Sequence, residues 1–244
     1  ELLCNSEILD VKGSAGNFDV KLLIKPRYVD PIKCNGCGLC AQNCPVRAIN
    51  IFNQGLNERS AVHVLYPQAV PQIYIIDREK CIGCGLCENI CLANAINFGD
   101  KERIEMINVG AIILSPGFDE FNATLKEELG YGRYSNVITS IEFERILSSS
   151  GPYEGHILRP SDGIIPKKIA WIQCIGSRDT KIGQEYCSGV CCMYATKEAI
   201  IAKEHCPDIE PTIFFIDIRA HGKGFEKFYE RAKDEYKVRY IRSR

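Results

Sequence analysis

Two cysteine runs of identical spacing constrain this chain more than any other feature. Each reads C-x2-C-x2-C-x3-C. This is the spacing with which proteins hold a pair of [4Fe–4S] clusters, three thiolates binding one cluster and the fourth binding the other. We therefore expect two clusters whose ligand sets cross between the runs. The first set would be Cys34, Cys37, Cys40 and Cys91, and the second would be Cys81, Cys84, Cys87 and Cys44.

The similarity between the runs extends beyond the cysteines. Asp30 and Asp77 precede them at the same distance, and "RAINI" at 47–51 matches "NAINF" at 94–98. A unit of about 47 residues is thus duplicated, as in a two-cluster ferredoxin domain. We place this α+β domain at residues 29–101. The segment 52–80 between the runs is longer than such a domain needs, and the sequence assigns it no role.

Zinc is the competing ligand for eight clustered thiols. Zinc sites usually use two well-separated C-x2-C pairs rather than a triple, so the spacing favours iron–sulfur clusters. One departure from the usual pattern is Leu92, which stands where a proline commonly follows the fourth cysteine. Because proline is not a ligand, we expect the second cluster to persist with an altered local turn.

The composition narrows the class of protein further. The chain has 244 residues, 14 cysteines and a formal net charge of −1. Clustered cysteines indicate metal ligation in a reducing compartment, so we expect a cytoplasmic protein. The near-neutral charge gives no case for nucleic-acid binding, and no apolar run is long enough to span a membrane. The sequence has no initial Met and stops within a strand-like run, which suggests a piece of a longer protein.

The segments on either side of the ferredoxin domain predict a second, interrupted domain. Residues 1–28 alternate like antiparallel strands, a β-meander, and "IEMINVGAIILSPGF" at 104–118 predicts two more strands. The second of these would end at Ser115, Pro116 and Gly117 and looks like the strand that returns to the flavin in thioredoxin-reductase-type flavoproteins. A plain buried strand is about as good an interpretation. We therefore expect one domain to comprise residues 1–28 and 102–244.

The last third of the chain predicts a Rossmann-type βαβ unit. Strands are expected within 167–179 and 212–220, with a helix from about Cys192 between them. Only Gly176 remains of the glycine loop that would bind a dinucleotide, so we do not expect NAD(P) there. A helix N-terminus suits an anionic centre, and a third [4Fe–4S] cluster is one interpretation. A redox disulfide or buried free thiols are the alternatives for Cys174, Cys187, Cys191 and Cys192.

Several segments together resemble the A subunit of heterodisulfide reductase, an iron–sulfur flavoprotein of anaerobes. They include "YPQAVPQIYIID", "IQCIGSRD", "YCSGVCCMYATKEA" and "FFIDIRAHGKGFEKFYERA". The resemblance implies an α/β, thioredoxin-reductase-like domain with an inserted two-cluster ferredoxin. It further implies FAD, flavin-based electron bifurcation in methanogenesis, and a third cluster on the four cysteines. The implied partners are other heterodisulfide-reductase-type subunits, an electron-input hydrogenase or formate dehydrogenase subunit, and ferredoxin.

The resemblance also places a lysine, Lys197, beside the flavin, and Glu144 is the candidate for its acidic partner. Ser115, Pro116 and Gly117 would approach the same cofactor. A solvated helix lysine is the competing interpretation of Lys197. The flavin fingerprint G-x-G-x-x-G is absent from these residues, so we expect FAD to be shared with a further segment or another chain. Two other functions stay open: a ferredoxin-like carrier without flavin chemistry, and an NAD(P)H-dependent flavoprotein.

Overall fold

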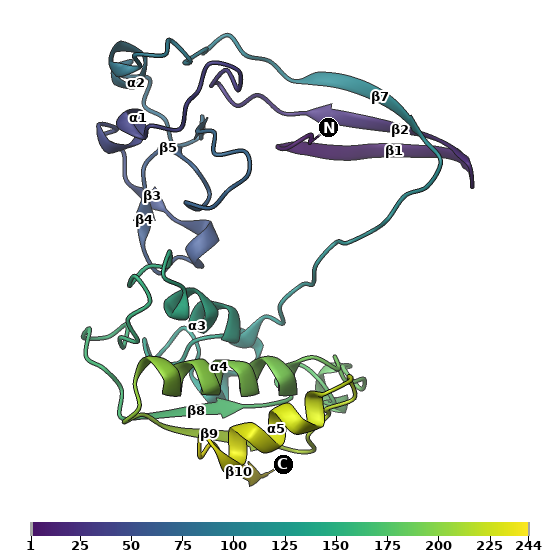
Figure 1. Cartoon of the computed structure of the whole chain (residues 1–244), viewed down its shortest axis with the longest axis vertical. Helices are drawn as coiled ribbons and strands as arrows, with labels where there is room; N and C mark the ends of the chain where they lie inside the picture. Colours follow the sequence, from purple (N-terminus) through teal and green to yellow (C-terminus); the bar gives the residue numbers. More distant parts are fainter. Residues whose placement is uncertain (1, 244) are drawn as a thin grey trace. The chain divides into compact units, whose positions relative to one another are not determined.

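The structure, a computed structural model, describes residues 2–243 and divides into two compact units (Figure 1). The first unit runs through Phe52 and resumes from Glu58 to Phe118. The second begins with Asn53–Asn57 and continues from Asp119 onward. Each unit has its own hydrophobic core, and each is described by itself below.

The first unit consists of strands and two short helices. Its elements are β1 (Ser6–Ser14), β2 (Asn17–Ile24), α1 (Leu39–Gln42), β3 (Ala48–Ile49), β4 (Glu58–Arg59), β5 (Val62–His63), β6 (Ile75–Ile76), α2 (Leu86–Ile90) and β7 (Arg103–Val109), with the 3-10 turn η1 (Ile51–Asn53) at the unit boundary. The residues between β2 and β7 contain both cysteine runs.

The strands that flank the cysteine runs form one antiparallel sheet in the order β1-β2-β7. β2 pairs with β7 from Phe18 opposite Val109 to Ile24 opposite Arg103. Val20, Leu22 and Ile24 lie on one face of β2 because side chains alternate along a strand, and they form a small buried cluster. Chain segments before and after the cysteine runs are thus hydrogen-bonded neighbours.

The ends of the cysteine-bearing part also meet. The backbone N–H groups of Arg27 and Tyr28 donate to the Asp100 carboxylate at 2.8 and 3.2 Å. Val29 forms an isolated antiparallel bridge with Ile96. This closure lets residues 29–101 leave and rejoin the sheet at one place, as an inserted domain requires.

One predicted strand is absent. Within the described residues, the stretch between β7 and η2 contains no strand. The prediction of a strand ending at Ser115, Pro116 and Gly117 is therefore wrong. Its apolar side chains are exposed, Ile113 by 92% and Leu114 by 77%. A strand needs a neighbour to accept its hydrogen bonds, and none of the described strands pairs with this segment.

The second unit is a three-stranded parallel sheet with helices. Its elements are the 3-10 turns η2 (Ala123–Leu125) and η3 (Glu127–Leu129), α3 (Ser140–Leu147), β8 (Lys168–Ile172), η4 (Thr180–Ile182), α4 (Cys191–His205), β9 (Glu210–Phe215), α5 (Phe225–Asp234) and β10 (Arg239–Arg242).

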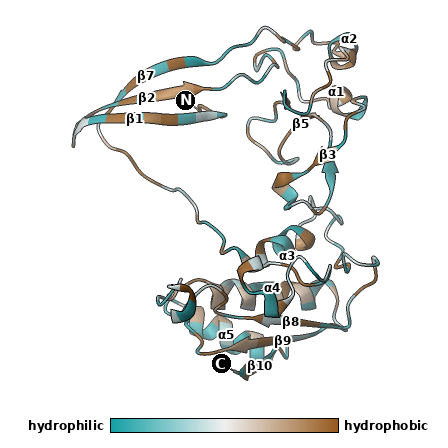
Figure 2. Cartoon of the chain, turned by 180° about the vertical axis from the view of Figure 1, so that it is seen from behind, coloured by the Kyte–Doolittle hydropathy of each residue, from teal (hydrophilic) through white to brown (hydrophobic). Residues whose placement is uncertain are grey.

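The sheet has the order β10-β9-β8, with both neighbouring pairs parallel. The predicted βαβ order is therefore present, and α4 lies along β8 and β9 in Figure 1. Figure 2 shows apolar residues along β8 and β9, as expected for strands of a parallel sheet. Ile146 of α3, Ile209 and Ile213 are among the largest fully buried side chains.

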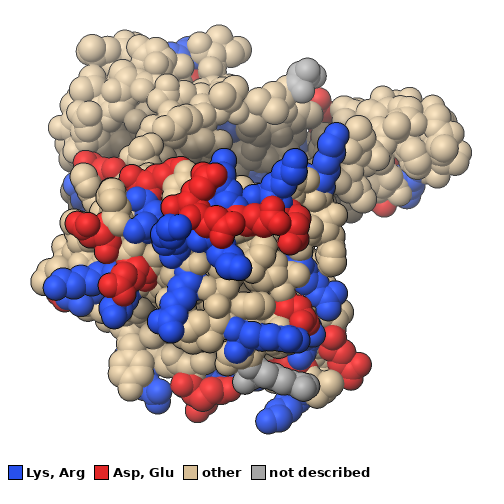
Figure 3. Space-filling model, turned by 60° about the horizontal axis from the view of Figure 1, so that its bottom comes forward, with Lys and Arg blue, Asp and Glu red and all other residues tan. Residues whose placement is uncertain are grey.

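Within residues 2–243, each helix is too short or too polar to cross a bilayer. Figure 3 shows basic and acidic side chains intermingled on the face it presents, in keeping with the net charge of −1.

Candidate metal centres

One pocket of the first unit brings together cysteines from both runs. It is lined by Cys44 of the first run and by Cys81, Cys84 and Cys87 of the second. Apolar side chains, including Val62 and Phe98, complete the lining. These are the four thiols that the spacing assigns to one cluster.

The other predicted set also lies together. The pKa of Cys40 is raised to about 11, first by burial and then by the nearby Cys34, Cys37 and Cys91. Charges influence one another in this way only over short distances. Cys91, the last cysteine of the second run, therefore lies near Cys40 of the first run. Thiolates that lie this close together repel one another. Bound iron ions offset that repulsion, so the arrangement suits a metal cluster.

The backbone around the cysteines is repeated in the two halves. Gly38 and Gly85 precede α1 and α2 with φ of 83° and 74°, and Gly36 and Gly83 both have φ of 71°. These left-handed conformations favour glycine. They turn peptide N–H groups toward sulfur, as in the Gly83 N–H donation to Cys81 Sγ at 3.4 Å. Such bonds are a main determinant of cluster potentials.

The chemistry of the donor set fits iron–sulfur clusters. Thiolate-only ligands, apolar surroundings and N–H donors to sulfur are all features of iron–sulfur sites.

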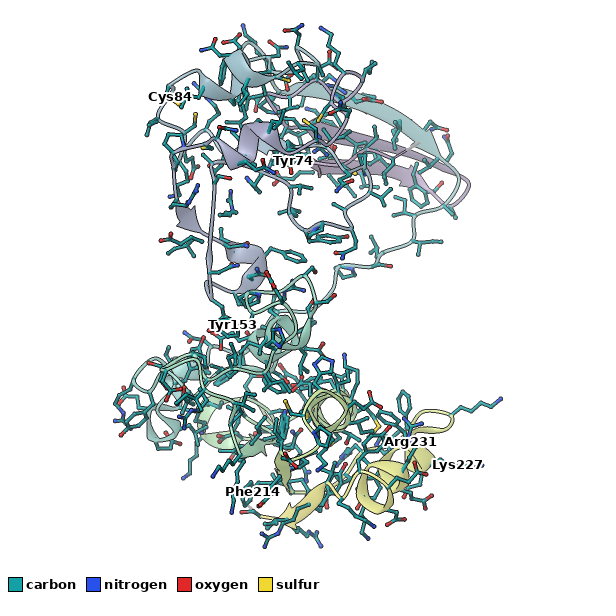
Figure 4. All side chains as sticks on the ribbon, turned by 60° about the vertical axis from the view of Figure 1, so that its left-hand side comes forward. Tyr74, Cys84, Tyr153, Phe214, Lys227 and Arg231 are labelled. Carbon is teal, nitrogen blue, oxygen red and sulfur yellow. The ribbon has the colours of Figure 1, made fainter. Side chains whose placement is uncertain are left out.

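The segment between the runs covers the first cysteine loop. The Tyr74 side chain lies close to this loop, because a Cβ added to Gly38 would lie 3.0 Å from the Tyr74 hydroxyl. A Cβ on Gly36 would lie 2.8 Å from the Gln72 carbonyl oxygen. Figure 4 labels Tyr74 in the first unit, together with Cys84 of the second run. Sequence reasoning found no role for this segment, because nothing in its composition signals what it packs against.

The remaining four predicted ligands gather in the second unit, at the carboxyl end of β8 and the start of α4. Cys174 follows β8 by two residues in a left-handed conformation, φ 63°, and Cys191 and Cys192 open α4. The pKa of Cys174 is raised by burial and then by Cys191, while Arg178 opposes the shift and Cys187 adds to it. Cys187, Cys191 and Cys192 are therefore each within electrostatic range of Cys174.

The two adjacent cysteines interact directly. The Cys192 thiol donates to the Cys191 sulfur, which lowers the pKa of Cys191 and raises that of Cys192. The Cys192 thiol also lies 3.5 Å from the Asp217 carbonyl oxygen. Cys191 is thus prepared as a thiolate at the N-terminus of α4, where the helix dipole stabilises negative charge.

The loop that carries Cys187 is held by several contacts. The Ser177 hydroxyl donates to the Tyr186 carbonyl at 2.9 Å and accepts from the Ser188 N–H at 3.3 Å. Lys126 forms an ion pair with Asp179 in the same loop. Beneath the loop, Phe121 packs on Gly176 so closely that a Cβ there would lie 2.0 Å from the ring. Phe121 was missed in the sequence, where no pattern distinguishes it.

Lys197 and Glu144, predicted as a pair, form an ion pair between α4 and α3. Both side chains are partly exposed, 47% and 30%. Ser115, Pro116 and Gly117 belong to the first unit and lie in the irregular, exposed stretch after β7. The role of these three residues at a flavin stays a prediction.

A buried carboxyl next to Lys197 escaped the sequence analysis. Glu198 has no exposed surface, and its pKa is raised to about 7, chiefly by burial. Its oxygens accept hydrogen bonds from the Ser140 hydroxyl and from Trp171 Nε1, the latter at 2.7 Å. A glutamate in a helix normally faces water, so only the packing reveals it.

A first comparison with known proteins concerns the ferredoxin region. The family profile described as "4Fe-4S dicluster domain" matches residues 33–95, which contain both cysteine runs. The prediction of a domain for two [4Fe–4S] clusters is confirmed at this level.

Curated relatives match the chain from end to end. It is 53% identical, over all 244 of its residues, to the A subunit of the H(2)/formate:CoB-CoM heterodisulfide,ferredoxin reductase of Methanococcus maripaludis. It is 49% identical over its full length to the iron-sulfur A subunit of the CoB-CoM heterodisulfide reductase of Methanocaldococcus jannaschii.

The coverage of these heterodisulfide reductase relatives is partial. The chain spans 37% of the length of each of these two proteins. It spans 30% of the A subunit of the ferredoxin/F(420)H(2)-dependent CoB-CoM heterodisulfide reductase of Methanosarcina acetivorans, to which it is 45% identical over 240 residues. The similarity therefore covers a part of each of these relatives rather than its whole length.

Proposed function

We propose that this chain is the iron–sulfur region of an electron-transferring oxidoreductase subunit of the heterodisulfide-reductase type. In this proposal, a ferredoxin domain at 29–101 is inserted into a thioredoxin-reductase-like domain formed by 1–28 and 102–244. The β2–β7 pairing and the closure at Asp100 support the insertion. A reducing cytoplasm would keep the thiols available as ligands.

The observation that carries the proposal is the pocket shared by Cys44 with Cys81, Cys84 and Cys87. Crossed ligand sets hold two clusters in one small domain, close enough for electrons to pass between them. The first cluster would take Cys34, Cys37, Cys40 and Cys91. The protein's part in electron transfer is to hold the clusters rigidly, to shield them with apolar side chains and to direct N–H groups at sulfur.

A third [4Fe–4S] cluster would be held by Cys174, Cys187, Cys191 and Cys192. Its support is the gathering of these thiols at the carboxyl edge of a parallel sheet, where α/β proteins usually bind their ligands. The lowered pKa of Cys191 and the positive end of α4 favour an anionic centre at this position. Electrons would pass between this centre and the ferredoxin clusters.

This chain would also contribute to a site for FAD, whose chemistry divides an electron pair into single electrons that the clusters can carry, as flavin-based bifurcation requires. Lys197 is the residue of this chain proposed to stabilise negative charge at the flavin, with Glu144 orienting the lysine through their ion pair. The other wall of the flavin site would come from a further segment or another chain. The proposed partners are other heterodisulfide-reductase-type subunits, ferredoxin, and a hydrogenase or formate dehydrogenase subunit that supplies electrons. The relatives' names support this proposal as far as H(2), formate and ferredoxin.

The test is to purify the protein anaerobically, with the chains that accompany it, and to measure iron, acid-labile sulfide and FAD. About twelve irons per chain, with flavin, are expected for three clusters. About eight irons without flavin would reduce the chain to a ferredoxin-like carrier. Replacement of Cys187 by serine should remove about four irons, whereas C4S, at a cysteine outside all three sites, should remove none.

A further inference from the structure

Glu198 is the most deeply buried ionisable group of the second unit that the cysteine sites do not use. Its side chain has no exposed surface. It lies in α4 between α3 and β8, where Ser140 and Trp171 each donate one hydrogen bond to it. Trp171 is itself fixed by an edge-to-face contact with Phe143, with ring centroids 5.6 Å apart. Each carboxyl oxygen therefore has a donor, and the group is built into the helix interface.

The surroundings stabilise both protonation states. Two hydrogen-bond donors favour the carboxylate, whereas burial without a direct ion pair favours the neutral acid. Burial is the larger effect, and it raises the pKa of Glu198 to about 7. Such a group exchanges a proton near neutral pH, and the exchange changes the strength of the hydrogen bonds that it accepts.

The same helix pair carries a charged pair next to this group. Lys197 precedes Glu198 in α4, and Glu144 lies one helical turn beyond Ser140 in α3. The ammonium of Lys197 favours the charged form of Glu198, and the carboxylate of Glu144 opposes it. Tyr194, one turn earlier in α4, is the further titratable group that interacts with Glu198, and its own pKa is raised by burial first.

We propose that Glu198 is a buried proton-binding site that is electrostatically coupled to the Lys197–Glu144 ion pair. Negative charge arriving beside Lys197 weakens the attraction that keeps Glu198 ionised, so one proton binds one carboxylate oxygen. No other bond forms or breaks. The proton comes from solvent, and the partly exposed Ser140 hydroxyl is the group of this chain that connects Glu198 to it.

The link to electron transfer rests on the proposed function. If a redox group next to Lys197 accepts one electron, uptake of one proton at Glu198 balances the added charge inside the protein. Glu198 would thereby make the reduction of the group beside Lys197 depend on pH, although Glu198 does not contact that group. The coupling between Glu198 and the ion pair, however, is a property of this chain alone.

The chain supplies its own probe, since it contains a single tryptophan, Trp171, whose indole N–H donates to Glu198. The hydrogen-bond-sensitive indole band in ultraviolet resonance Raman spectra should change with pH in the cluster-containing protein. We expect a midpoint at about pH 7 and its loss in E198Q. Replacing Ser140 with alanine should raise the midpoint, because it removes a donor to the carboxylate.

The decisive variants leave Glu198 in place. K197M should raise the midpoint and E144Q should lower it, each by roughly half a pH unit or more. K203M and E204Q, further along the same helix, are matched controls and should leave it unchanged. The proposal would be overturned by a band that does not change with pH. It would also be overturned by a midpoint that is the same in K197M, E144Q and the wild type.

This outcome is independent of the iron content. A shift in K197M with only about eight irons per chain would keep the proton site while rejecting the third cluster. An unshifted midpoint with about twelve irons per chain would keep the third cluster while rejecting the proton site.

Discussion

Cys44 lines the same pocket as Cys81, although the two cysteines belong to different halves of a duplicated sequence. The reciprocal relationship holds for Cys91 and Cys40. The fourth cysteine of each run, which follows the short helix α1 or α2, thus lies near thiols of the other run. Crossing of this kind makes the two cluster sites depend on each other, and it leads to a prediction that single substitutions alone would not test.

Paired cysteine-to-serine variants should separate crossed from uncrossed ligation. C44S/C81S removes two ligands of one predicted cluster, so about four irons should be lost. C44S/C34S removes one ligand from each cluster, so about eight should be lost. Iron content and electron paramagnetic resonance of the reduced protein provide the measurement. The opposite ranking of the two double variants would show that each run holds its own cluster.

The duplicated halves also provide a matched test of the segment between the runs. Gly36 and Gly83 occupy equivalent positions with the same φ of 71°, but only Gly36 faces a neighbour, the Gln72 carbonyl oxygen. G36A and G83A therefore share the backbone strain of about 1 kcal/mol. The clash should make G36A less stable by about a further 1–3 kcal/mol in denaturant unfolding. Equal destabilisation would mean that residues 71–74 do not pack on the first cysteine loop in solution.

Gly176 should be intolerant of any side chain. An added Cβ would lie 2.0 Å from the Phe121 ring, at a residue with φ of 71°. Gly183 has φ of 70° and no neighbour within 4 Å, so G183A measures the backbone strain alone. We expect G176A to unfold at least about 1 kcal/mol more easily than G183A. Removal of the ring in F121A/G176A should recover part of that difference, and failure to do so would exclude the ring as its cause.

The sequence predicted best those features that are local or repeated. Cysteine spacing, left-handed glycines and the β-α-β order are set by short segments, and the structure contains the corresponding loops and elements. The strand ending at Gly117 failed because strand formation depends on a partner that the local pattern does not reveal. Helix α4 begins at Cys191, one residue before the expected start.

The residues that sequence reasoning missed act through long-range packing. Phe121 contacts Gly176, Tyr74 contacts Gly38, and Glu198 meets Ser140 and Trp171. None of these partners is near in sequence, and none of the residue types is unusual. The resemblance to a known family supplies Lys197, whereas Glu144 is only a candidate for its acidic partner. The charges alone favour a solvated helix surface.

The stability of the second unit should depend on pH through Glu198. Its pKa rises from 4.5 to about 7 on folding, so the folded state holds a proton more tightly than the unfolded state. This contribution is complete below pH 4.5 and is lost as the pH rises through about 7. The free energy of unfolding of the wild type should therefore fall, relative to that of E198Q, between about pH 5.5 and 7.5, with a slope of at most about 1.4 kcal/mol per pH unit. Anaerobic denaturant unfolding at several pH values measures the difference, and E204Q should behave like the wild type. Parallel pH profiles for the wild type and E198Q would show that Glu198 is already ionised throughout this range.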